Sequence, residues 1–476
     1  MGPSMDVPAR LRAYYEAGSP TRELADRLVE AGRECFLVGG TVRDAFLGVS
    51  SPDVDLATDA HPDEVRRLVE GWADHLWLQG ERFGTIGAEW RGLRFEITTY
   101  RGDVYRPETR KPTVTYANRI EDDLARRDFT INAMALRLPN PVLVDPHGGA
   151  VDLAARRLRT PVAPEVSFEA DPLRMLRGAR FVAGFALEPT PELLHAIETL
   201  RHRLEIVSGE RVRDELCRLI TVEDPSAGLW LLCETRLADE FLPELNAMRL
   251  EQDPIHTHKD VLAHTIAVVA NTNPEHLTVR LAALFHDIGK PKTRSIGPGG
   301  VSFHHHEVVG ARMAEERLRA LRFSNDIVEE VTKLVYLHLR IHTYAMGWTD
   351  TAVRRYVRDA GPLLAELNEL QRADCTTRNR RKAAALARRM DDLETRIEEL
   401  RTREQLDAIR PPLDGRQVMA YLGVTPGPTV GEALDFLLDA RLDEGPISPE
   451  DAYARLDAWA TQRGIEPARS QVESAR

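Results

Sequence analysis

The stretch FLVGGTVRDAFLGVSSPDVDLA, residues 36–57, joins an apolar run, a glycine pair, a short amphipathic segment and two aspartates one residue apart. The apolar run predicts a buried strand. Gly39 and Gly40 allow a sharp turn and a close approach of the backbone to a ligand. Thr41 then begins a predicted helix. Because the exposed amides of a helix start suit a phosphate, and Arg43 adds a cation one turn later, the stretch predicts a phosphate-binding strand–turn–helix unit.

The two aspartates, Asp53 and Asp55, predict a metal site beside that turn. Side chains at i and i+2 of an extended strand point to the same face. Two carboxylates held together repel one another unless a cation lies between them, and Mg²⁺ takes one or two carboxylates together with substrate phosphates. Two-metal sites of this kind promote in-line displacement at phosphorus. Glu96, on a later predicted strand, is the third carboxylate that could complete the site.

Each of these features also has a simpler explanation. Thr41 can be the N-cap of the helix with Asp44 as its capping-box partner, and an isolated D-x-D is more often a solvated turn. The order of the features, with the carboxylate pair following a phosphate-type turn, is what favours a catalytic site.

Length and composition limit the class of protein. With 476 residues the chain is long enough for two to four domains, and 43% hydrophobic and 29% charged residues are typical of a globular protein. No apolar stretch approaches the ~18–20 residues of a membrane span, and the N-terminus lacks the apolar region of a signal peptide. Four scattered cysteines without C-x-x-C fit a reducing cytoplasm and argue against a disulfide framework or a thiolate zinc site. The net charge of −12 does not exclude nucleic-acid binding, because binding needs a local basic face and not a basic average.

The pattern of apolar residues changes along the chain. Residues 34–145 predict mixed α/β structure, with strand-like runs CFLVG, TIGAEW, LRFEITTY and VLVD and helical patterns such as DEVRRLVEGW between them. From about residue 150 onward the spacing is helical and almost no strand is predicted. We therefore expect an α/β head with a mixed sheet, followed by a long all-helical body.

Six motifs in the first half occur in the order found in a known family. The chain resembles the class II tRNA nucleotidyltransferases, which are the CCA-adding enzymes and the related bacterial poly(A) polymerases, over residues 35–220. The resemblance implies a polymerase-β-like nucleotidyltransferase head. It is carried by GGTVRD, DVD, ARRDFTINAMAL (125–136), DPHGGAVDL (145–153), DPLRMLRGARF (171–181) and GERVRDEL (209–216).

The resemblance implies a role for each matching residue. Asp53 and Asp55 would hold two Mg²⁺ ions, with Glu96 as a further catalytic carboxylate, and Gly40 and Arg43 would hold the triphosphate. The R-R-D-x-T-x-N motif would grip the nucleotide through Arg126, Arg127, Asp128 and Asn132. Without the resemblance, the arginine pair could be solvated and the asparagine could cap a helix.

A row of charged residues at the start of another predicted helix implies base selection. The row consists of Asp171, Arg174, Arg177 and Arg180, at i, i+3 spacing. In the family an E-D-x-x-R motif reads the incoming base, and here Ala170 replaces the glutamate. An ionised Asp can only accept hydrogen bonds and Arg can only donate them, which matches the amine and ring nitrogen of cytosine and adenine. Asp171 followed by Pro172 is also an ordinary helix start.

The motif HDIGK (286–290) predicts a second metal centre. A single buried histidine is usually a core residue, but here the order H…HD…H…H…D resembles the HD superfamily of metal phosphohydrolases over residues 250–375. The resemblance implies a site for Mn²⁺, Ni²⁺, Fe²⁺ or Mg²⁺, in a domain that is hydrolytic in some relatives and structural in others. The candidate ligands are His264, His286, Asp287, His306, His338 and Asp374.

The remaining residues predict contacts with RNA. A basic run that follows Asp374 could track a phosphate backbone, and includes Arg380, Arg381 and Lys382. The acidic half of the same helix is a solvated face, and the tail resembles the helical module of HD-containing CCA-adding enzymes. The predicted parts are a nucleotidyltransferase head (1–150), a helical nucleotide-selecting and RNA-binding neck (151–250), an HD domain (251–375) and a tRNA-binding tail (376–476).

The resemblance implies a cytoplasmic tRNA nucleotidyltransferase that adds CCA to tRNA 3′ ends from CTP and ATP, without a template, and releases pyrophosphate. No membrane partner is expected. The alternatives are a bacterial poly(A) polymerase, which shares the head, and an HD-type phosphohydrolase that acts on RNA ends with the head serving only to bind RNA. The intact D-x-D argues against the second alternative.

Overall fold

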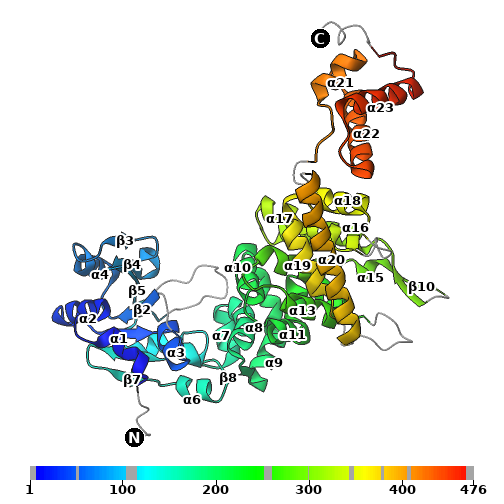
Figure 1. The fold of residues 1–476 in the computed structure, drawn as a ribbon. Helices are drawn as coiled ribbons and strands as arrows, with labels where there is room; N and C mark the ends of the chain where they lie inside the picture. The colour runs from blue at the N-terminus through cyan, green and yellow to red at the C-terminus, as the bar shows by residue number, and fades with distance from the viewer. Residues whose placement is uncertain are drawn as a thin grey trace. The chain divides into compact units, whose positions relative to one another are not determined.

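The computed structural model describes residues 7–49, 53–102, 115–250, 260–297, 300–341, 348–376, 380–404 and 409–467. The chain divides into two compact units, one of residues 1–247 with 320–323 and one of residues 248–319 with 324–476 (Figure 1). No described helix is long and apolar enough to cross a membrane. The finer division into four parts remains a prediction.

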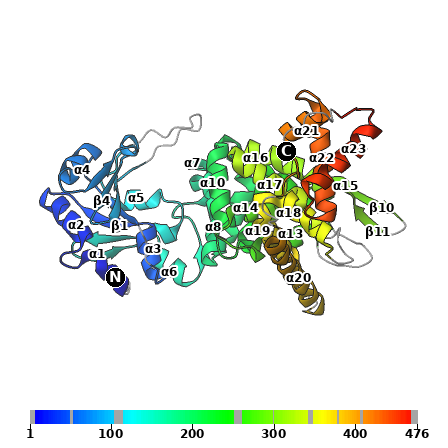
Figure 2. The same ribbon diagram turned by 45° about the horizontal axis from the view of Figure 1, so that its top comes forward.

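The first unit contains a mixed sheet, as the sequence predicts, with strand order β3-β4-β5-β2-β1-β6-β7. The pair of β2 with β5 is parallel and the other pairs are antiparallel. Helices α2 (Pro20–Glu30) and α4 (Pro62–Val69) pack against this sheet (Figure 2). The strands are β1 (Cys35–Val38), β2 (Asp53–Thr58), β3 (His75–Trp77), β4 (Thr85–Trp90), β5 (Leu93–Thr99), β6 (Ala135–Leu138) and β7 (Val142–Val144).

The sheet is anchored by its strand β1, which is buried on both faces. All four residues of β1 are buried, and β1 lies between β2 and β6. The apolar residues of β2 and β5 alternate with polar ones, so that Val54 and Phe95 face the core while the residues on either side of each face outward. This alternation places a polar face across the middle of the sheet.

Helices complete the first unit. Helix α3 (Gly40–Phe46) follows β1, and α5 (Ile120–Ala125) precedes β6. Helix α8 packs against α10 and α11. The helices after the sheet are α6 (Gly149–Ala154), α7 (Pro164–Ala170), α8 (Leu173–Phe185), α9 (Pro191–Leu200), α10 (Gly209–Ile220), α11 (Ser226–Glu234) and α12 (Pro243–Ala247).

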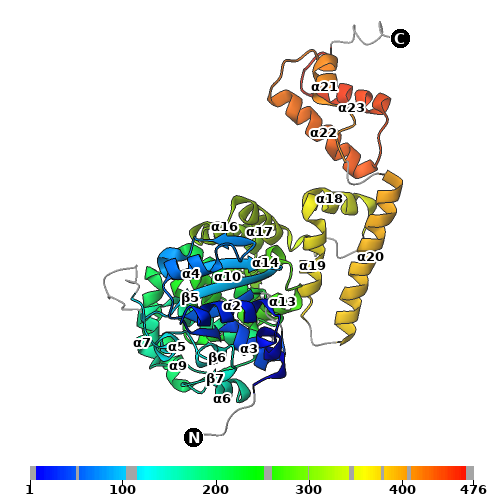
Figure 3. The ribbon, with the colours of Figure 1, turned by 90° about the vertical axis from the view of Figure 1, so that its left-hand side faces the viewer.

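The second unit is mostly helical. Helix α20 packs along α18 and α19, and α21, α22 and α23 pack together around a core that includes Val418, Leu437 and Trp459 (Figure 3). The helices are α13 (Val261–Asn271), α14 (Leu277–Phe285), α15 (Lys290–Thr293), α16 (His306–Ala320), α17 (Asn325–Leu337), α18 (Asp350–Ala360), α19 (Leu364–Asp374), α20 (Arg380–Glu404), α21 (Gly415–Leu422), α22 (Pro428–Glu444) and α23 (Pro449–Gln462).

The body is mostly helical, as expected, but it is not all-helical, because its described residues include four short strands. Strands β10 (Arg294–Gly297) and β11 (Gly300–Phe303) form an antiparallel ribbon, and β8 (Arg157–Leu158) pairs with β9 (Glu188–Pro189). These strands are two to four residues long. Such short strands carry too few residues for a period-2 pattern, so the sequence signal is absent.

Candidate functional site

The three predicted carboxylates lie on one polar face of the sheet. Asp53 and Asp55 alternate along β2, and Asp55 pairs in register with Glu96 of β5. Asp55 is half-buried, while Asp53 and Glu96 are exposed. Burial raises the pKa of Asp55 to about 6, against the influence of Arg127 and with the help of Glu96 and Asp53. Crowded carboxylates of this kind are stabilised by a divalent cation, so the donor set fits Mg²⁺.

The glycine turn lies directly beside Asp55. Gly39 has φ 65° and ψ −130°, a conformation open to glycine. A Cβ on Gly39 would lie 2.8 Å from Nη1 of Arg127 and 3.4 Å from Oδ2 of Asp55. The side chain of Thr41 accepts a hydrogen bond from the amide of Asp55 at 3.0 Å, which ties the start of α3 to β2.

The capping-box alternative for Thr41 is wrong. The N-cap of α3 is Gly39, without a side-chain cap. Asp44 instead accepts hydrogen bonds from Nε and Nη2 of Arg43, at 2.9 and 2.7 Å. Nη1 of Arg43 donates to Oδ1 of Asn132 at 2.7 Å. Arg43 is therefore held by a carboxylate on one side and an amide on the other.

A buried carboxylate that the sequence analysis missed organises the arginine pair. Asp123, at the side of α5, is fully buried. Its Oδ1 accepts from Nε of Arg126 at 3.0 Å and its Oδ2 accepts from Nη2 of Arg127 at 3.1 Å. Although burial opposes ionisation, Arg127 and Arg126 lower the pKa of Asp123. The sequence contains a signal for these ion pairs, because Asp123 precedes Arg126 by three residues and Arg127 by four, and both spacings favour ion pairs in a helix.

Asp128, between α5 and β6, links Asn132 to helix α8. Its Oδ2 accepts from Nε of Arg177 at 2.9 Å, and its Oδ1 accepts from Nδ2 of Asn132 at 2.9 Å. Burial opposes ionisation here too, but Arg177 and Asn132 lower the pKa of Asp128 to about 2. Helix α8 also contributes Phe185, whose ring lies 4.4 Å from the guanidinium carbon of Arg43. The glycine turn, the R-R-D motif and α8 therefore form one connected cluster.

The charged row on α8 is arranged differently from the expectation. Helix α8 begins at Leu173, and its amide donates to Oδ1 of Asp171 at 3.2 Å. Asp171 pairs with Arg211 of α10 at 3.0 Å, a partner that i, i+3 spacing does not predict. Arg174 is 8% exposed and donates to Oγ of Ser167 at 2.8 Å. Arg180 pairs with the buried Glu215 of α10.

The six predicted HD ligands come together in two groups of three. One group is His264, His286 and Asp374, the other is Asp287, His306 and His338, and in each group one ligand atom per residue lies within 4.8 Å of the others. Nε2 of His264 lies 2.9 Å from Oδ1 of Asp374. Nε2 of His306 lies 3.4 Å from Oδ1 of Asp287. The two groups adjoin, because Nε2 of His286 lies 3.3 Å from Oδ2 of Asp287.

The outer nitrogens of these histidines are already engaged. Nδ1 of His286, His306 and His338 lies 2.7, 2.8 and 2.6 Å from a backbone carbonyl oxygen. A hydrogen bond at Nδ1 fixes the ring so that Nε2 serves as the ligand atom. The donor set therefore fits a divalent metal centre of imidazole and carboxylate ligands.

The predicted RNA-binding run lies at the start of α20. Arg381 and Lys382 are exposed on this helix. Arg380 is its first residue, and the Arg380 side chain lies outside the described residues. Their role stays a prediction.

Comparisons with known proteins agree with this architecture. Three family models match the chain: the Poly A polymerase head domain over residues 35–159, the "Probable RNA and SrmB- binding site of polymerase A" over 184–249, and the HD domain over 261–379. A structure of the Bacillus stearothermophilus CCA-adding enzyme in complex with CTP has a TM-score of 0.64 at 24% identity, over 97% of this chain and 99% of that one. This likeness confirms the predicted fold.

Two relatives match over nearly their whole length. The A-adding tRNA nucleotidyltransferase of Deinococcus radiodurans is 36% identical over 440 residues, 90% of this chain and 95% of that protein. The CC-adding tRNA nucleotidyltransferase of Thermus thermophilus is 35% identical over 453 residues, 90% of this chain and 94% of that protein. Fold and site together define a nucleotidyltransferase, a class of enzyme that uses divalent metal, with a fused HD domain. The chain belongs to the tRNA nucleotidyltransferase family, as its motifs predict.

Proposed function

We propose that this protein builds the CCA end of tRNA from CTP and ATP, without a template, and releases pyrophosphate. The observation that carries the proposal is the face formed by Asp53, Asp55 and Glu96 beside the Gly39–Gly40 turn. Nucleotidyl transfer needs carboxylates and a triphosphate cradle at one place, and a protein that only binds RNA needs neither. A tRNA substrate also supports a cytoplasmic location.

Asp53 and Asp55 would hold two Mg²⁺ ions, which when bound lower the pKa of the attacking 3′-hydroxyl and neutralise charge on the leaving pyrophosphate. Glu96 adds a third carboxylate on the same face. The backbone of Gly40 and the guanidinium of Arg43 bind the triphosphate, and Arg43 is pre-oriented by its bonds to Asp44 and Asn132. Orientation by fixed groups lowers the entropic cost of bringing the reactants together.

The cluster around α8 would hold the nucleoside. Asp128 and Asn132 connect to α8 through Arg177, and Nη2 of Arg174 on α8 donates to the backbone oxygen of Arg126. Arg126 and Arg127 share Asp123, so the motif and α8 form one hydrogen-bonded network, which supports a shared role in nucleotide binding. Asp171 and Arg174 would select cytosine and adenine, because the carboxylate accepts from the exocyclic amine and the guanidinium donates to the ring nitrogen. Asp171 must then leave Arg211, and Arg174 must leave Ser167, when the base arrives. Arg177 pairs with Asp128 and Arg180 pairs with Glu215, and these pairs would hold the charged residues of α8 in position.

The test is direct. Purified protein is incubated with tRNA transcripts that end before CCA, after the first C and after CC, each with CTP, ATP or both, and the product ends are sequenced. Addition confined to C and A on these ends supports the proposal. Long adenylate tails would instead identify a poly(A) polymerase, and no addition to any end would reject nucleotidyl transfer. The same products show whether the chain adds CC, A or all three, since its two full-length relatives are named for different parts of CCA.

A second activity is favoured by the HD cluster. The converging Nε2 atoms and the two carboxylates support a hydrolytic site for a phosphate ester, with Mn²⁺, Ni²⁺, Fe²⁺ or Mg²⁺ as the metal. Release of phosphate from nucleotides or 2′,3′-cyclic phosphate RNA ends, with each metal in turn, tests it. If no metal supports hydrolysis and none is retained, the HD domain is structural.

The four predicted parts and the basic run are retained as proposals. Arg380, Arg381 and Lys382 would contact tRNA phosphates, supported by the exposure of Arg381 and Lys382 on α20.

A further inference from the structure

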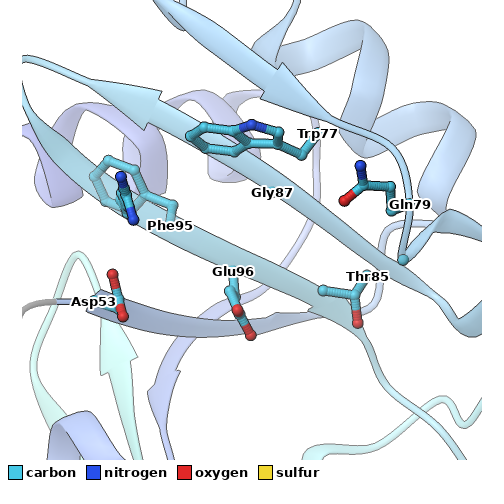
Figure 4. A pocket seen from close by; sticks show the side chains of 9 residues that line it. Asp53, Trp77, Gln79, Thr85, Gly87, Phe95 and Glu96 are labelled. Carbon is cyan, nitrogen blue, oxygen red and sulfur yellow. The ribbon is translucent and has the colours of Figure 1, made fainter. Parts of the chain in front are cut away.

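A pocket of about 430 Å³ lies on the sheet on the far side of the carboxylates from the glycine turn. Its wall is formed by β3, β4 and β5, and Asp53 and Glu96 lie at its edge (Figure 4). None of the predicted nucleotide-binding residues other than these carboxylates lines it. A pocket of this size holds one small ligand, and Asp53 and Glu96 of the predicted metal site are among its lining residues.

The register of the sheet explains how the pocket is formed. Trp77 of β3 pairs with Gly87 of β4, which pairs with Glu96 of β5, which pairs with Asp55 of β2. Directly paired residues lie on the same face of a sheet, so the four positions form one row that ends at the carboxylates. A Cβ on Gly87 would lie 3.2 Å from the Trp77 ring. The glycine therefore lets the indole lie over β4, as Figure 4 shows.

The exposed groups of the pocket have the chemistry of a site for a nucleotide. Trp77 is 38% exposed, although large aromatic side chains are usually buried. The side chain of Arg94 is 67% exposed and pairs with Glu89 at 3.5 Å. Its guanidinium carbon lies 5.9 Å from the Trp77 ring centroid. Single-stranded RNA ends are commonly bound by stacking of a base on an aromatic ring beside a cation that neutralises phosphate.

The two flanks of the carboxylates cannot serve the same substrate. The glycine turn, Arg43 and α8 lie on the β1 side, where they form the connected cluster proposed above for the triphosphate and its base. The pocket lies on the opposite side, toward β3. In-line displacement requires the attacking oxygen to approach from the side away from the leaving pyrophosphate. The pocket is therefore where the second substrate, the RNA 3′ end, can enter.

We infer that this pocket binds the 3′-terminal nucleotide of the acceptor RNA, with its base stacked on Trp77 and a nearby backbone phosphate bound by Arg94. Glu96 and Trp77 are two strands apart, roughly 10 Å between backbones, and one nucleoside bridges that span with its 3′-hydroxyl at the carboxylates. The inference rests on the proposed function. It also explains how ends of changing sequence can be extended, because stacking accepts every base.

The experiment is a two-by-two cycle between protein and RNA. Trp77→Ala is combined with a tRNA whose 3′-terminal nucleotide lacks its base, and the KM values for the tRNA and for the nucleoside triphosphate are measured. Trp77→Ala should raise the KM for intact tRNA by about 5- to 150-fold, which is one base–aromatic stack of ~1–3 kcal/mol at 1.4 kcal/mol per tenfold. The KM for the triphosphate should not change. Trp77→Phe should restore most of the tRNA affinity.

The base-less end separates stacking from a general loss of structure. Wild-type protein should lose about as much affinity for the base-less tRNA as Trp77→Ala loses for the intact one, and the two losses together should not add. Tyr336→Ala, which removes an aromatic side chain of similar exposure (43%) from α17, should behave as the wild type. If the base-less tRNA binds wild-type protein normally, if the losses add, or if only the triphosphate KM rises, the inference is wrong.

The arginine is tested by salt dependence. Arg94→Gln should reduce the magnitude of the log–log salt slope of tRNA binding by about 0.7–0.9, the value for one phosphate contact. Arg91→Gln, in the turn between β4 and β5, should leave the slope unchanged. Equal slopes for both variants would remove Arg94 from the site.

Failure of the proposed function has a different signature. If wild-type protein adds no nucleotide to any tRNA, nucleotidyl transfer is rejected. The cycle is then run on tRNA binding alone, by filter retention without triphosphate, where coupling between Trp77 and the terminal base supports the pocket assignment and its absence overturns it.

Discussion

Gly39→Ala tests whether the turn after β1 is fixed by backbone conformation or by ligand contact. Gly39 has φ 65° and ψ −130°, and an added Cβ would lie 2.8 Å from Nη1 of Arg127. At Gly40 the nearest atom to an added Cβ is Nη2 of Arg43 at 3.5 Å, an ordinary contact. Gly40→Ala is therefore a matched control one residue away.

The expected magnitude follows from two costs. A non-glycine residue in this backbone region costs about 1–3 kcal/mol. Arg127 must also move, and a hydrogen bond from its guanidinium to the buried Asp123 is worth about 1.5–3 kcal/mol if it breaks. Gly39→Ala should therefore destabilise the first unit by roughly 2.5–6 kcal/mol when that bond breaks. Gly40→Ala should change stability by less than about 0.5 kcal/mol.

Thermal unfolding without nucleotide measures the difference. At about 2–4 °C per kcal/mol for a unit of this size, Gly39→Ala should lower the Tm of the first unit by at least about 4 °C. Gly40→Ala should leave Tm unchanged but raise the KM for the triphosphate, because its methyl group enters the phosphate turn. Equal Tm values for wild type and Gly39→Ala would refute the conformational argument. A lowered Tm for Gly40→Ala would show that Gly40 is the constrained residue.

Three further outcomes are expected. Asp55→Asn should reduce nucleotide addition by at least about 10³-fold while tRNA binding survives, since the charge stabilisation at such a metal site is worth several kcal/mol. Asp59→Asn is the control, and near-normal turnover of Asp55→Asn would contradict the catalytic assignment. The double variant His286→Ala, Asp287→Ala should abolish retention of Mn²⁺ or Ni²⁺, measured by elemental analysis. Nucleotide addition should stay within about twofold of the wild type, because the HD site lies in the other unit. Loss of metal retention together with nucleotide addition would link the two sites. Asp171→Ala should increase incorporation of UTP and GTP on tRNA lacking CCA, because an unpaired buried group normally costs the wrong base about 1–3 kcal/mol or more. Unchanged selectivity would leave Asp171 as a residue that accepts from the Leu173 amide and pairs with Arg211.

The sequence was most informative where a short local pattern determines structure. The apolar run of β1, the alternation in β4 and β5, and the spacing of Asp53 and Asp55 are local properties, and the structure has these strands and this shared face. The order of motifs was sufficient for the family, and the six HD residues, far apart in the chain, form two groups. The residue types of the six HD residues favour a metal site, because buried histidines and aspartates need a charged or hydrogen-bonding partner.

The partners of the charged side chains depended on tertiary structure. Asp171 meets Arg211 of α10 rather than Arg174, its neighbour on the next turn, because packing of α8 on α10 brings the two helices into contact. The spacing of Asp123 to Arg126 and Arg127 is visible in the sequence, but its full burial depends on the packing of Ile120 and Leu124 of α5 against the sheet. Helical spacing defines which ion pairs are available, and packing selects among them.

The sequence by itself determined the family, the α/β head followed by a helical body, and the residue types of the predicted metal site, since each is encoded in residues close together or in a fixed order. Only the tertiary structure revealed the pocket, because Trp77, Gly87 and Glu96 become neighbours through the register of β3, β4 and β5. A one-residue slip in that register would turn Trp77 to the other face. Strand register is set by the packing of the whole sheet, and no local stretch of sequence specifies it.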